Sequence, residues 1–276
     1  MAKRSVLDSL RLKFVRCVVV VPTYNEKENI QPFLAAVRTA VPLASILVVD
    51  DNSPDGTGGL AEQAAAELGQ IKVMHRPGKQ GLGSAYRNGF TVALDEGYEV
   101  IVSMDVDFSH DPAVIPALLA AIDAGADAVV GSRYVAGGAT ADWPLHRRVL
   151  SRWGNRYTGA VLGLRVRDCT SGFRAYRATA MRDIDPASTS AEGYAFLTEL
   201  IRRLVVNGHP VTEVPIVFRD REFGTSKMSS RIIAESMLLV TRWGVSDIVH
   251  RRRPSRQSRR SPGPQADRLE NPNTSN

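Results

Sequence analysis

The sequence is poor in cysteine and has no long apolar run, and both absences narrow the class of protein. Only two of its 276 residues are cysteine, Cys17 and Cys169, too few for a disulfide scaffold. Cys17 opens an apolar run, where we expect a buried thiol. No segment reaches the roughly 18–20 consecutive apolar residues of a membrane-spanning helix, and no apolar stretch of a secretory signal follows the basic N-terminus. We therefore expect a protein of the reducing cytoplasm.

The body of the chain lacks an excess of positive charge, although the whole chain carries +6. Residues 1–16 carry a net +4 and residues 250–276 a net +5, which leaves residues 17–249 at −3. A body of this charge argues against a duplex binder, so we expect no nucleic-acid partner. The basic ends fit an anionic membrane surface, where each Lys or Arg contributes about 1 kcal/mol. A merely solubilising role for them remains an equal alternative.

A phosphate-binding loop of the common kinds is also missing. The glycine-rich stretch Gly78–Gly83 has neither the G-x-x-x-x-G-K-[ST] order nor the G-x-G-x-x-G order. It therefore predicts a tight turn before a helix.

Short apolar runs alternate with helical patterns through the first half of the chain. The runs predict strands at 17–21, 46–49, 71–74 and 100–104, and the helical patterns cover 26–41, 58–68, 84–94 and 112–124. This alternation predicts βαβ units and an α/β fold with a mostly parallel sheet. Ligands bind such sheets at the carboxyl ends of the strands, which places 22–25, 50–55 and 105–107 on a single edge.

After Gly131 the alternation is less regular. A helical pattern covers 143–164, and residues 173–218 contain two strands that flank a helix near 195–206. Residues 227–249 form a last amphipathic helix pattern. From residue 251 onward Arg, Ser, Pro, Gln and Asn dominate, which predicts a disordered tail.

Two carboxylates at the predicted edge carry the strongest chemical signal. Asp105 and Asp107 stand on either side of Val106 directly after a buried strand. Such a pair repels itself unless a cation lies between, and Mg²⁺ characteristically takes one or two carboxylates together with phosphate oxygens and water. At the neighbouring strand end we assign Asp51 to a ribose or base, and Asp55 or Thr57 to capping of the next helix.

Three motifs in order, Val21–Glu26 (VPTYNE), Val48–Gly56 (VVDDNSPDG) and Asp105–His110 (DVDFSH), resemble family 2 glycosyltransferases of the GT-A fold. Later segments, 131–134, 170–174 and 223–227, make the chain similar to actinobacterial polyprenol- or dolichol-phosphate mannose synthases from about residue 16 to 227. The resemblance implies a mostly parallel central sheet flanked by helices. Together with the charge and composition of the two ends, we expect a basic arm at 1–15, a catalytic domain at 16–222, an amphipathic helix region at 223–250 and the tail at 251–276.

The resemblance further implies roles for individual residues. Those that bind the nucleotide sugar are Pro22, Tyr24, Glu26, Val49, Asp51, Asp105, Val106, Asp107, Arg133, Arg221 and Lys227. Those that bind the lipid phosphate are Arg133, Arg147 and Ser151. Mg²⁺ or Mn²⁺ is held by Asp107 with Asp105 beside it. Ser109 stands where some relatives carry a glutamine ligand, which weakens the case for its coordination. Catalysis is carried by Asp105, Asp107, Arg133, Arg221 and Lys227.

The implied reaction moves mannose from GDP-mannose to a polyprenyl phosphate with inversion at the anomeric carbon. A phosphate acceptor is already anionic at neutral pH, so the reaction needs alignment and charge neutralisation rather than a general base. No residue of the motifs separates mannose from glucose. A UDP-glucose-dependent polyprenyl-phosphate glucosyltransferase and a non-catalytic subunit that binds a nucleotide sugar therefore remain alternatives.

A lipid acceptor requires contact with a membrane, and two segments are candidates for it. In the first, the aromatic and apolar residues Trp143, Leu145, Leu150, Trp153 and Tyr157 are interleaved with Arg147, Arg148 and Arg152. In the second, Ile233, Met237, Val240 and Trp243 lie on one side of a helix. Packing against the sheet is the alternative for both. We expect peripheral attachment at the cytoplasmic face of the plasma membrane, with a possible integral membrane partner subunit.

Overall fold

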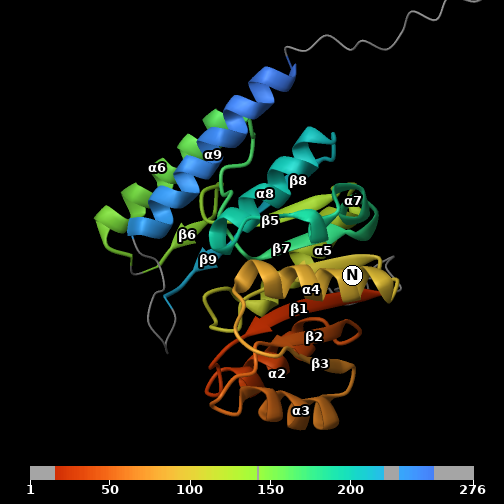
Figure 1. Cartoon of the computed structure of the whole chain (residues 1–276). Helices are drawn as coiled ribbons and strands as arrows, with labels where there is room; N and C mark the ends of the chain where they lie inside the picture. Colours follow the sequence, from red (N-terminus) through yellow and green to blue (C-terminus); the bar gives the residue numbers. More distant parts are fainter. Residues whose placement is uncertain (1–15, 142, 221–229, 252–276) are drawn as a thin grey trace, which may run out of the picture.

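The computed structural model describes residues 16–141, 143–220 and 230–251, and a seven-stranded sheet forms its centre (Figure 1). The strands are β1 (Cys17–Thr23), β2 (Ser45–Asp50), β3 (Ile71–His75), β4 (Val100–Ser103), β5 (Ala128–Ser132), β7 (Arg174–Arg177) and β8 (Val211–Pro215). Their order across the sheet is β3-β2-β1-β4-β7-β5-β8. The four strands predicted in the first half of the chain are confirmed.

The sheet is mostly parallel, as predicted, with β7 as the exception. β7 runs antiparallel to both neighbours, β4 and β5, whereas the pairs β1–β2, β1–β4, β2–β3 and β5–β8 are parallel. Pro22 pairs with Val49 and Thr23 with Asp50, so β1 and β2 end side by side. Because β7 is reversed, the loop that precedes it lies at the edge where β1, β2 and β4 end.

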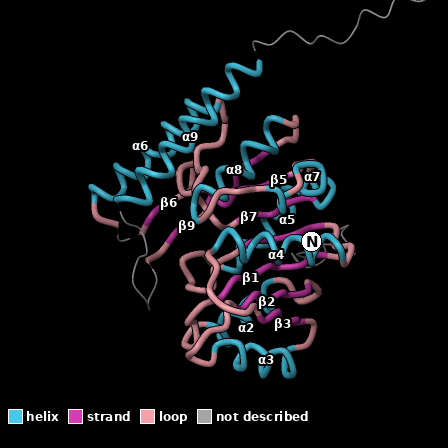
Figure 2. Tube along the Cα trace, in the orientation of Figure 1, coloured by secondary structure: helices cyan, strands magenta, loops and turns pink. Residues whose placement is uncertain are grey.

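Helices cover both faces of the sheet (Figures 1 and 2). They are α2 (Ile30–Ala40), α3 (Thr57–Leu68), α4 (Leu82–Asp95), α5 (Ile115–Asp123), α7 (Ala178–Ile184) and α8 (Gly193–Val206), with short 3₁₀ turns η1 (Pro112–Val114) and η2 (Pro186–Ser188). Val19 and Val21 of β1 belong to one apolar cluster, and Val18 and Val20 belong to the other. The continuous apolar run of β1 is therefore buried on both faces, as its sequence predicts.

α2 begins four residues later than predicted. Asn25 has a φ of 59°, and the carbonyl of Glu26 accepts hydrogen bonds from the N–H groups of Asn29 and Ile30 at 3.0 and 2.9 Å. A left-handed residue followed by this turn interrupts the helical pattern, so its first turn belongs to the loop after β1.

Two long helices, α6 (Leu145–Leu162) and α9 (Ser230–Arg251), lie side by side beyond the sheet (Figure 1). A two-stranded parallel sheet, β6 (Ala139–Thr140) with β9 (Val217–Phe218), lies below them. The Tyr157 and Thr241 hydroxyls are 2.6 Å apart and join the two helices. Within the described residues, no helix has both the length and the apolar character needed to cross a bilayer.

Two residues of the predicted apolar side of α9, Val240 and Trp243, pack inward, which corrects the weak preference for the membrane at these two positions. Val240 is buried, and Trp243 packs against the same cluster as α8. Arg202 of α8 donates from Nε to Asp247 of α9 at 2.9 Å. The predicted basic arm, and the predicted tail beyond Arg251, lie outside the described residues.

Candidate active site

Four segments meet at one edge of the sheet, three of which follow strand ends. The backbone N–H of Asp51 donates to the carbonyl of Thr23 at 3.0 Å, which joins the loops after β2 and β1. The fourth segment, residues 170–173, enters the edge because β7 is antiparallel. Ser103 Oγ at the end of β4 donates to the carbonyl of Gly172 at 2.8 Å. Alternation of strands and helices places the first three segments, whereas only the sheet topology brings in the fourth.

The turn Asp105–Ser109 presents two carboxylates. Val106 is buried in the core, and Asp105 and Asp107 on either side of it line one cavity. Asp107 Oδ1 accepts the N–H of Ser109 at 3.1 Å. Phe108 has a φ of 54°, a left-handed conformation that is uncommon for an aromatic residue. The chain therefore turns sharply here and returns Ser109 to the carboxylate.

A cavity of about 190 Å³ collects most of the predicted phosphate and metal residues. Those that line it are Asp105, Asp107, Ser109, Arg133, Arg147 and Ser151. Its wall also contains His110, Trp143, Trp153, Asn155, Thr170, Phe218 and Asp220, none of which was predicted to bind phosphate or metal. Because α6 supplies one side of this wall, the cavity extends from the sheet edge to the helix pair beyond it.

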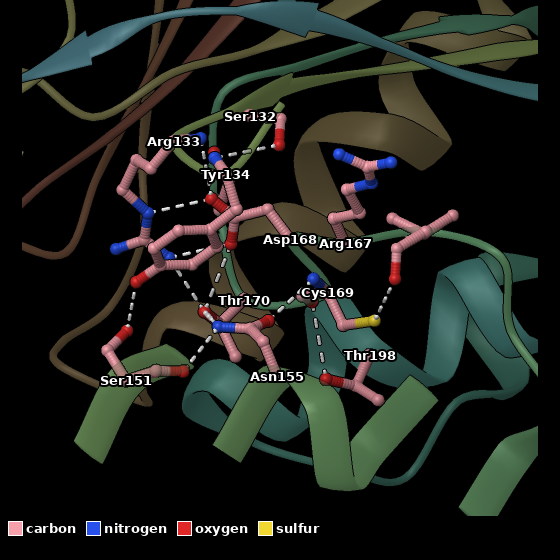
Figure 3. A network of polar contacts seen from close by, with 12 residues as sticks. Ser132, Arg133, Tyr134, Ser151, Asn155, Arg167, Asp168, Cys169, Thr170 and Thr198 are labelled. Atoms are coloured by element: carbon pink, nitrogen blue, oxygen red, sulfur yellow. Dashed lines mark hydrogen bonds and ion pairs between the residues drawn. The ribbon is translucent and has the colours of Figure 1, made fainter. Parts of the chain in front are cut away.

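Arg133 is held by a buried ion pair with Asp168 (Figure 3). Asp168 is fully buried and accepts three hydrogen bonds from Arg133, from the backbone N–H at 3.0 Å and from Nε and Nη2 at 2.7 Å each. Burial alone would raise the pKa of Asp168, but the charge and hydrogen bonds of Arg133 outweigh burial and lower it. The bidentate geometry fixes the plane of the guanidinium at the cavity wall.

The same network reaches α6 through two further contacts (Figure 3). Thr170 Oγ1 accepts from Arg133 Nη2 at 2.8 Å and from Asn155 Nδ2 at 3.2 Å. The Tyr134 hydroxyl lies 2.6 Å from Ser151 Oγ. Arg133 and Ser151, both predicted to bind the lipid phosphate, are thus parts of one hydrogen-bonded unit.

Arg147 lines the cavity and lies between an aromatic ring and a carboxylate. Its guanidinium carbon is 3.9 Å from the centre of the Trp143 ring, and Nη1 donates to Asp220 Oδ1 at 2.8 Å. Trp143 Nε1 also donates to Asp220, at 2.9 Å. Only 7% of the surface of Trp143 is exposed. The prediction that it faces the membrane is therefore wrong.

Other predicted interfacial residues of α6 do face outward. Leu145, Leu150 and Trp153 are 72%, 46% and 51% exposed, and they lie close to the exposed Val149. Tyr157 instead packs against the core. The exposed apolar stripe therefore covers the N-terminal half of α6.

The residues predicted to hold the nucleotide lie along the ends of β1 and β2. Pro22 and Val49 are neighbours in register, and the Lys79 ammonium lies 4.2 Å from the centre of the Tyr24 ring. The N–H of Glu26 donates to Thr57 Oγ1 at 2.9 Å. The contact of Glu26 joins the loop after β1 to the start of α3, and that of Lys79 joins it to the glycine-rich connector.

Asp51 already has two protein partners. Its carboxylate forms a buried ion pair with Arg76 and accepts the N–H of Gln80 at 3.2 Å. It therefore organises the glycine-rich connector, which is a turn before α4 as predicted, and its contact with a nucleotide stays a prediction. Asp55 accepts the N–H of Thr57, the first residue of α3, at 3.0 Å, but the N-cap position itself is occupied by Gly56, which has no side-chain capping bond.

Two buried residues beside the carboxylates were not predicted. The hydroxyl of Tyr86 on α4 donates to Asp105 Oδ1 at 3.1 Å, and burial together with that carboxylate raises the pKa of Tyr86 well above its usual value. Burial lowers the pKa of His110 to about 4, so its imidazole is neutral at pH 7. It packs between the rings of Phe173 and Phe218. Tyr86 gave no local signal, whereas His110 belongs to the quoted DVDFSH motif.

The donor set fits a hard divalent cation that shares its coordination with a phosphate ligand. Within the described part of the chain, no group of three or more His, Cys, Asp or Glu residues could hold a metal alone. Two carboxylates beside arginine side chains match Mg²⁺ or Mn²⁺, which fill their other positions with phosphate oxygens and water. Arg221 and Lys227 lie outside the described residues.

Comparison with known proteins agrees with this architecture. A solved structure of glucosyl-3-phosphoglycerate synthase from Mycobacterium tuberculosis, in complex with Mn²⁺, UDP-glucose and phosphoglyceric acid, matches with a TM-score of 0.61 and 19% identity over 82% of this chain and 79% of that one. At this identity the likeness shows the fold alone, which is the predicted GT-A arrangement.

Two curated relatives are much more similar in sequence. A polyprenol monophosphomannose synthase of Mycolicibacterium smegmatis is 47% identical over 86% of this chain and 90% of its own length. An undecaprenyl-phosphate mannosyltransferase of Micrococcus luteus is 46% identical over 84% of this chain and 95% of its own. Residues 18–185 match the family described as glycosyl transferase family 2. The chain therefore belongs to glycosyl transferase family 2.

Proposed function

We propose that this protein transfers mannose from GDP-mannose to a polyprenyl phosphate and forms a β-linked lipid phosphate sugar. The observation that carries the proposal is the single cavity that joins Asp105 and Asp107 to Arg133, Arg147 and Ser151. A pair of carboxylates suits the cation of a nucleotide diphosphate, and the arginines suit a second phosphate group. The names of the two curated relatives, a polyprenol monophosphomannose synthase and an undecaprenyl-phosphate mannosyltransferase, support the mannosyl group and the lipid acceptor.

The chemistry follows from the charge of the two substrates. An oxygen of the acceptor phosphate forms a bond to the anomeric carbon while the bond from that carbon to the diphosphate breaks, and GDP leaves. The attacking oxygen of the acceptor is already anionic at neutral pH, so no side chain acts as a general base. A bound Mg²⁺ or Mn²⁺, held by Asp107 and Asp105, supplies positive charge to the leaving diphosphate.

The residues of the chain then provide alignment. Arg133 offers its guanidinium to the acceptor phosphate in an orientation that Asp168 fixes. Ser151 is held by Tyr134 at the other end of the same network. Arg221 and Lys227 complete the charge around the phosphates in this proposal. Effective alignment of two reacting groups removes about 7–11 kcal/mol from a barrier in favourable cases, and neutralisation of the phosphate charges adds to it.

The acceptor is lipid-bound, and the exposed stripe on α6 is where we place the membrane. Leu145, Leu150 and Trp153 project from the helix that also carries Arg147 and Ser151. A phosphate at the headgroup level can thus enter the cavity while its prenyl chain stays in the bilayer. We place this contact at the cytoplasmic face. An integral membrane partner subunit remains a prediction of the resemblance.

A transfer assay tests the proposal. The protein is incubated with radiolabelled GDP-mannose or UDP-glucose, Mn²⁺ and polyprenyl phosphate, and the lipids are extracted into organic solvent. We expect label from GDP-mannose alone, lost with EDTA or with Asp107→Asn and retained with Asp123→Asn, an exposed carboxylate at the end of α5.

The other outcomes are informative as well. Label from UDP-glucose alone would show a glucosyltransferase. Absence of transfer from either donor, with GDP-mannose still bound, would show a non-catalytic binding subunit and end the proposal.

A further inference from the structure

The position of Asp105 depends on α4, a helix that supplies no residue to the predicted site. α4 lies unusually close to the sheet, because a Cβ on Gly89 would stand 2.5 Å from Val20 Cγ1. Only glycine allows this approach at that point. Tyr86, one helical turn earlier, is consequently brought beneath the end of β4, where the turn that carries Asp105 begins.

Tyr86 is tightly packed in this place. Its side chain is fully buried, and its ring lies 5.3 Å from the Phe90 ring and 6.1 Å from the Phe196 ring in stacked arrangements. Two stacked neighbours leave the ring little freedom, so the direction of the hydroxyl is set by the core. That hydroxyl donates to Asp105 Oδ1 at 3.1 Å.

Asp105 is confined from a second direction by Gly172. A Cβ at Gly172 would stand 3.3 Å from Asp105 Oδ2 and 3.7 Å from Oδ1. The carboxylate therefore lies between the Tyr86 hydroxyl and the bare backbone of residue 172, and a side chain there would make it shift.

We propose that Tyr86 is a positioning residue, which holds the Asp105 carboxylate in the orientation that binds the divalent cation with the donor diphosphate. This inference rests on the proposed function, in which Asp105 is a metal ligand. Groups that hydrogen-bond to metal ligands fix their orientation, and their loss typically weakens metal affinity by about 10–100-fold. Tyr86 contacts neither substrate in this scheme and acts only through Asp105.

The test is Mn²⁺ binding in the presence of saturating GDP, measured as free Mn²⁺ by electron paramagnetic resonance. Tyr86→Phe keeps the ring and removes the hydroxyl, and we expect the Kd for Mn²⁺ to rise about tenfold. Tyr176→Phe is the matched control: it is also fully buried and touches the Phe90 ring, but its hydroxyl faces Arg174 at 3.5 Å. We expect the control to bind Mn²⁺ like the wild type.

A second variant and a kinetic measurement separate positioning from a general loss of structure. Gly172→Ala should also raise the Kd for Mn²⁺, since it displaces the same carboxylate without touching Tyr86. In transfer assays, Tyr86→Phe should need more Mn²⁺ for half-maximal rate and should recover its kcat when Mn²⁺ is saturating. A misfolded variant would recover nothing.

The outcomes distinguish this inference from the proposed function. If Tyr86→Phe binds Mn²⁺ as tightly as the wild type while Asp105→Asn binds it weakly, the role of Tyr86 is refuted and the metal site stands. If Asp105→Asn also binds normally, Asp105 is not a ligand and the inference is refuted. If the wild type binds no Mn²⁺ with GDP or UDP, metal dependence itself fails.

Discussion

The buried pair of Asp168 and Arg133 allows the sharpest quantitative prediction about stability. Asp168 is fully buried and accepts three hydrogen bonds from Arg133. Asp168→Asn keeps the shape, removes the negative charge and turns an NH₂ group toward donors of the guanidinium. Removal of one partner of a buried ion pair costs about 3–5 kcal/mol, because the other charge stays buried without compensation. In a chain of this size that loss lowers Tm by roughly 6–20 °C.

Urea unfolding followed by tryptophan fluorescence and circular dichroism measures this loss. The control is Asp220→Asn, which breaks an exposed aspartate–arginine pair: Arg147 Nη1 donates to both oxygens of Asp220, at 2.8 and 3.1 Å. The Asp220 side chain is 44% exposed, so its loss should cost at most about 1 kcal/mol. A loss below about 1 kcal/mol for Asp168→Asn would refute the reasoning, since it would mean that water reaches the pair.

The pH dependence provides a further check on the same pair. The pKa of Asp168 lies below its ordinary value of 3.8 in the folded protein. Its carboxylate therefore stabilises the fold fully above pH 3.8, and this contribution disappears as the pH falls through the lowered pKa. The difference in stability between the wild type and Asp168→Asn should stay constant at neutral pH and shrink in acid. A difference that grows in acid would contradict this assignment.

Three other predictions concern the acceptor side and the opposite end of the sheet. Arg147→Gln should raise the KM for polyprenyl phosphate about tenfold, because one charge-assisted hydrogen bond is lost, and should leave GDP binding unchanged. Weaker GDP binding would show that Arg147 binds the donor instead. Trp153→Ser should weaken binding to anionic vesicles, measured by flotation, roughly tenfold. Val206→Ser changes a residue of α8 that is equally exposed and should leave this binding unchanged. Burial lowers the pKa of His209, but hydrogen bonds to two aspartates raise it above 6.5 overall. Its stabilisation is thus complete below pH 6.5 and is lost as the pH rises through the raised pKa, so the Tm advantage over His209→Gln should narrow in alkali; a constant advantage would refute it.

Much of the fold could be predicted because its core strands carry a strong local signal. The uninterrupted apolar run at 17–21 indicates a strand buried on both faces, and Val18 and Val19 do enter opposite clusters. Asp105 and Asp107 could be found for a related reason. Carboxylates that directly follow such a strand must lie at its end, and in a parallel sheet those ends share one edge.

The partners of these residues could not be predicted. Asp168 is 35 residues from Arg133 and Tyr86 is 19 residues from Asp105, and no periodicity relates them. Asp168 lies in the loop between α6 and β7. Its position depends on the antiparallel insertion of β7 between β4 and β5. Local patterns indicate which faces of a strand are buried but not which strands lie beside it.

The aromatic residues in and just before α6 likewise show what local patterns cannot decide. Trp143 and Trp153 belong to one amphipathic pattern, yet the first is buried beside Arg133 and Phe218 and the second is exposed. An apolar residue has the same transfer free energy whether a core or a lipid receives it, so composition cannot distinguish the two.

The sequence by itself determined the alternating elements, the edge that carries Asp105 and Asp107, and the membership of a glycosyl transferase family. These follow from hydrophobic periodicity and from motifs that are contiguous in the chain. Only the tertiary structure decided that β7 is reversed, that Asp168 holds Arg133, that Tyr86 supports Asp105, and which tryptophan of the α6 segment faces outward. Each of these depends on contacts between distant segments, whose free energy is gained only when the whole sheet is assembled.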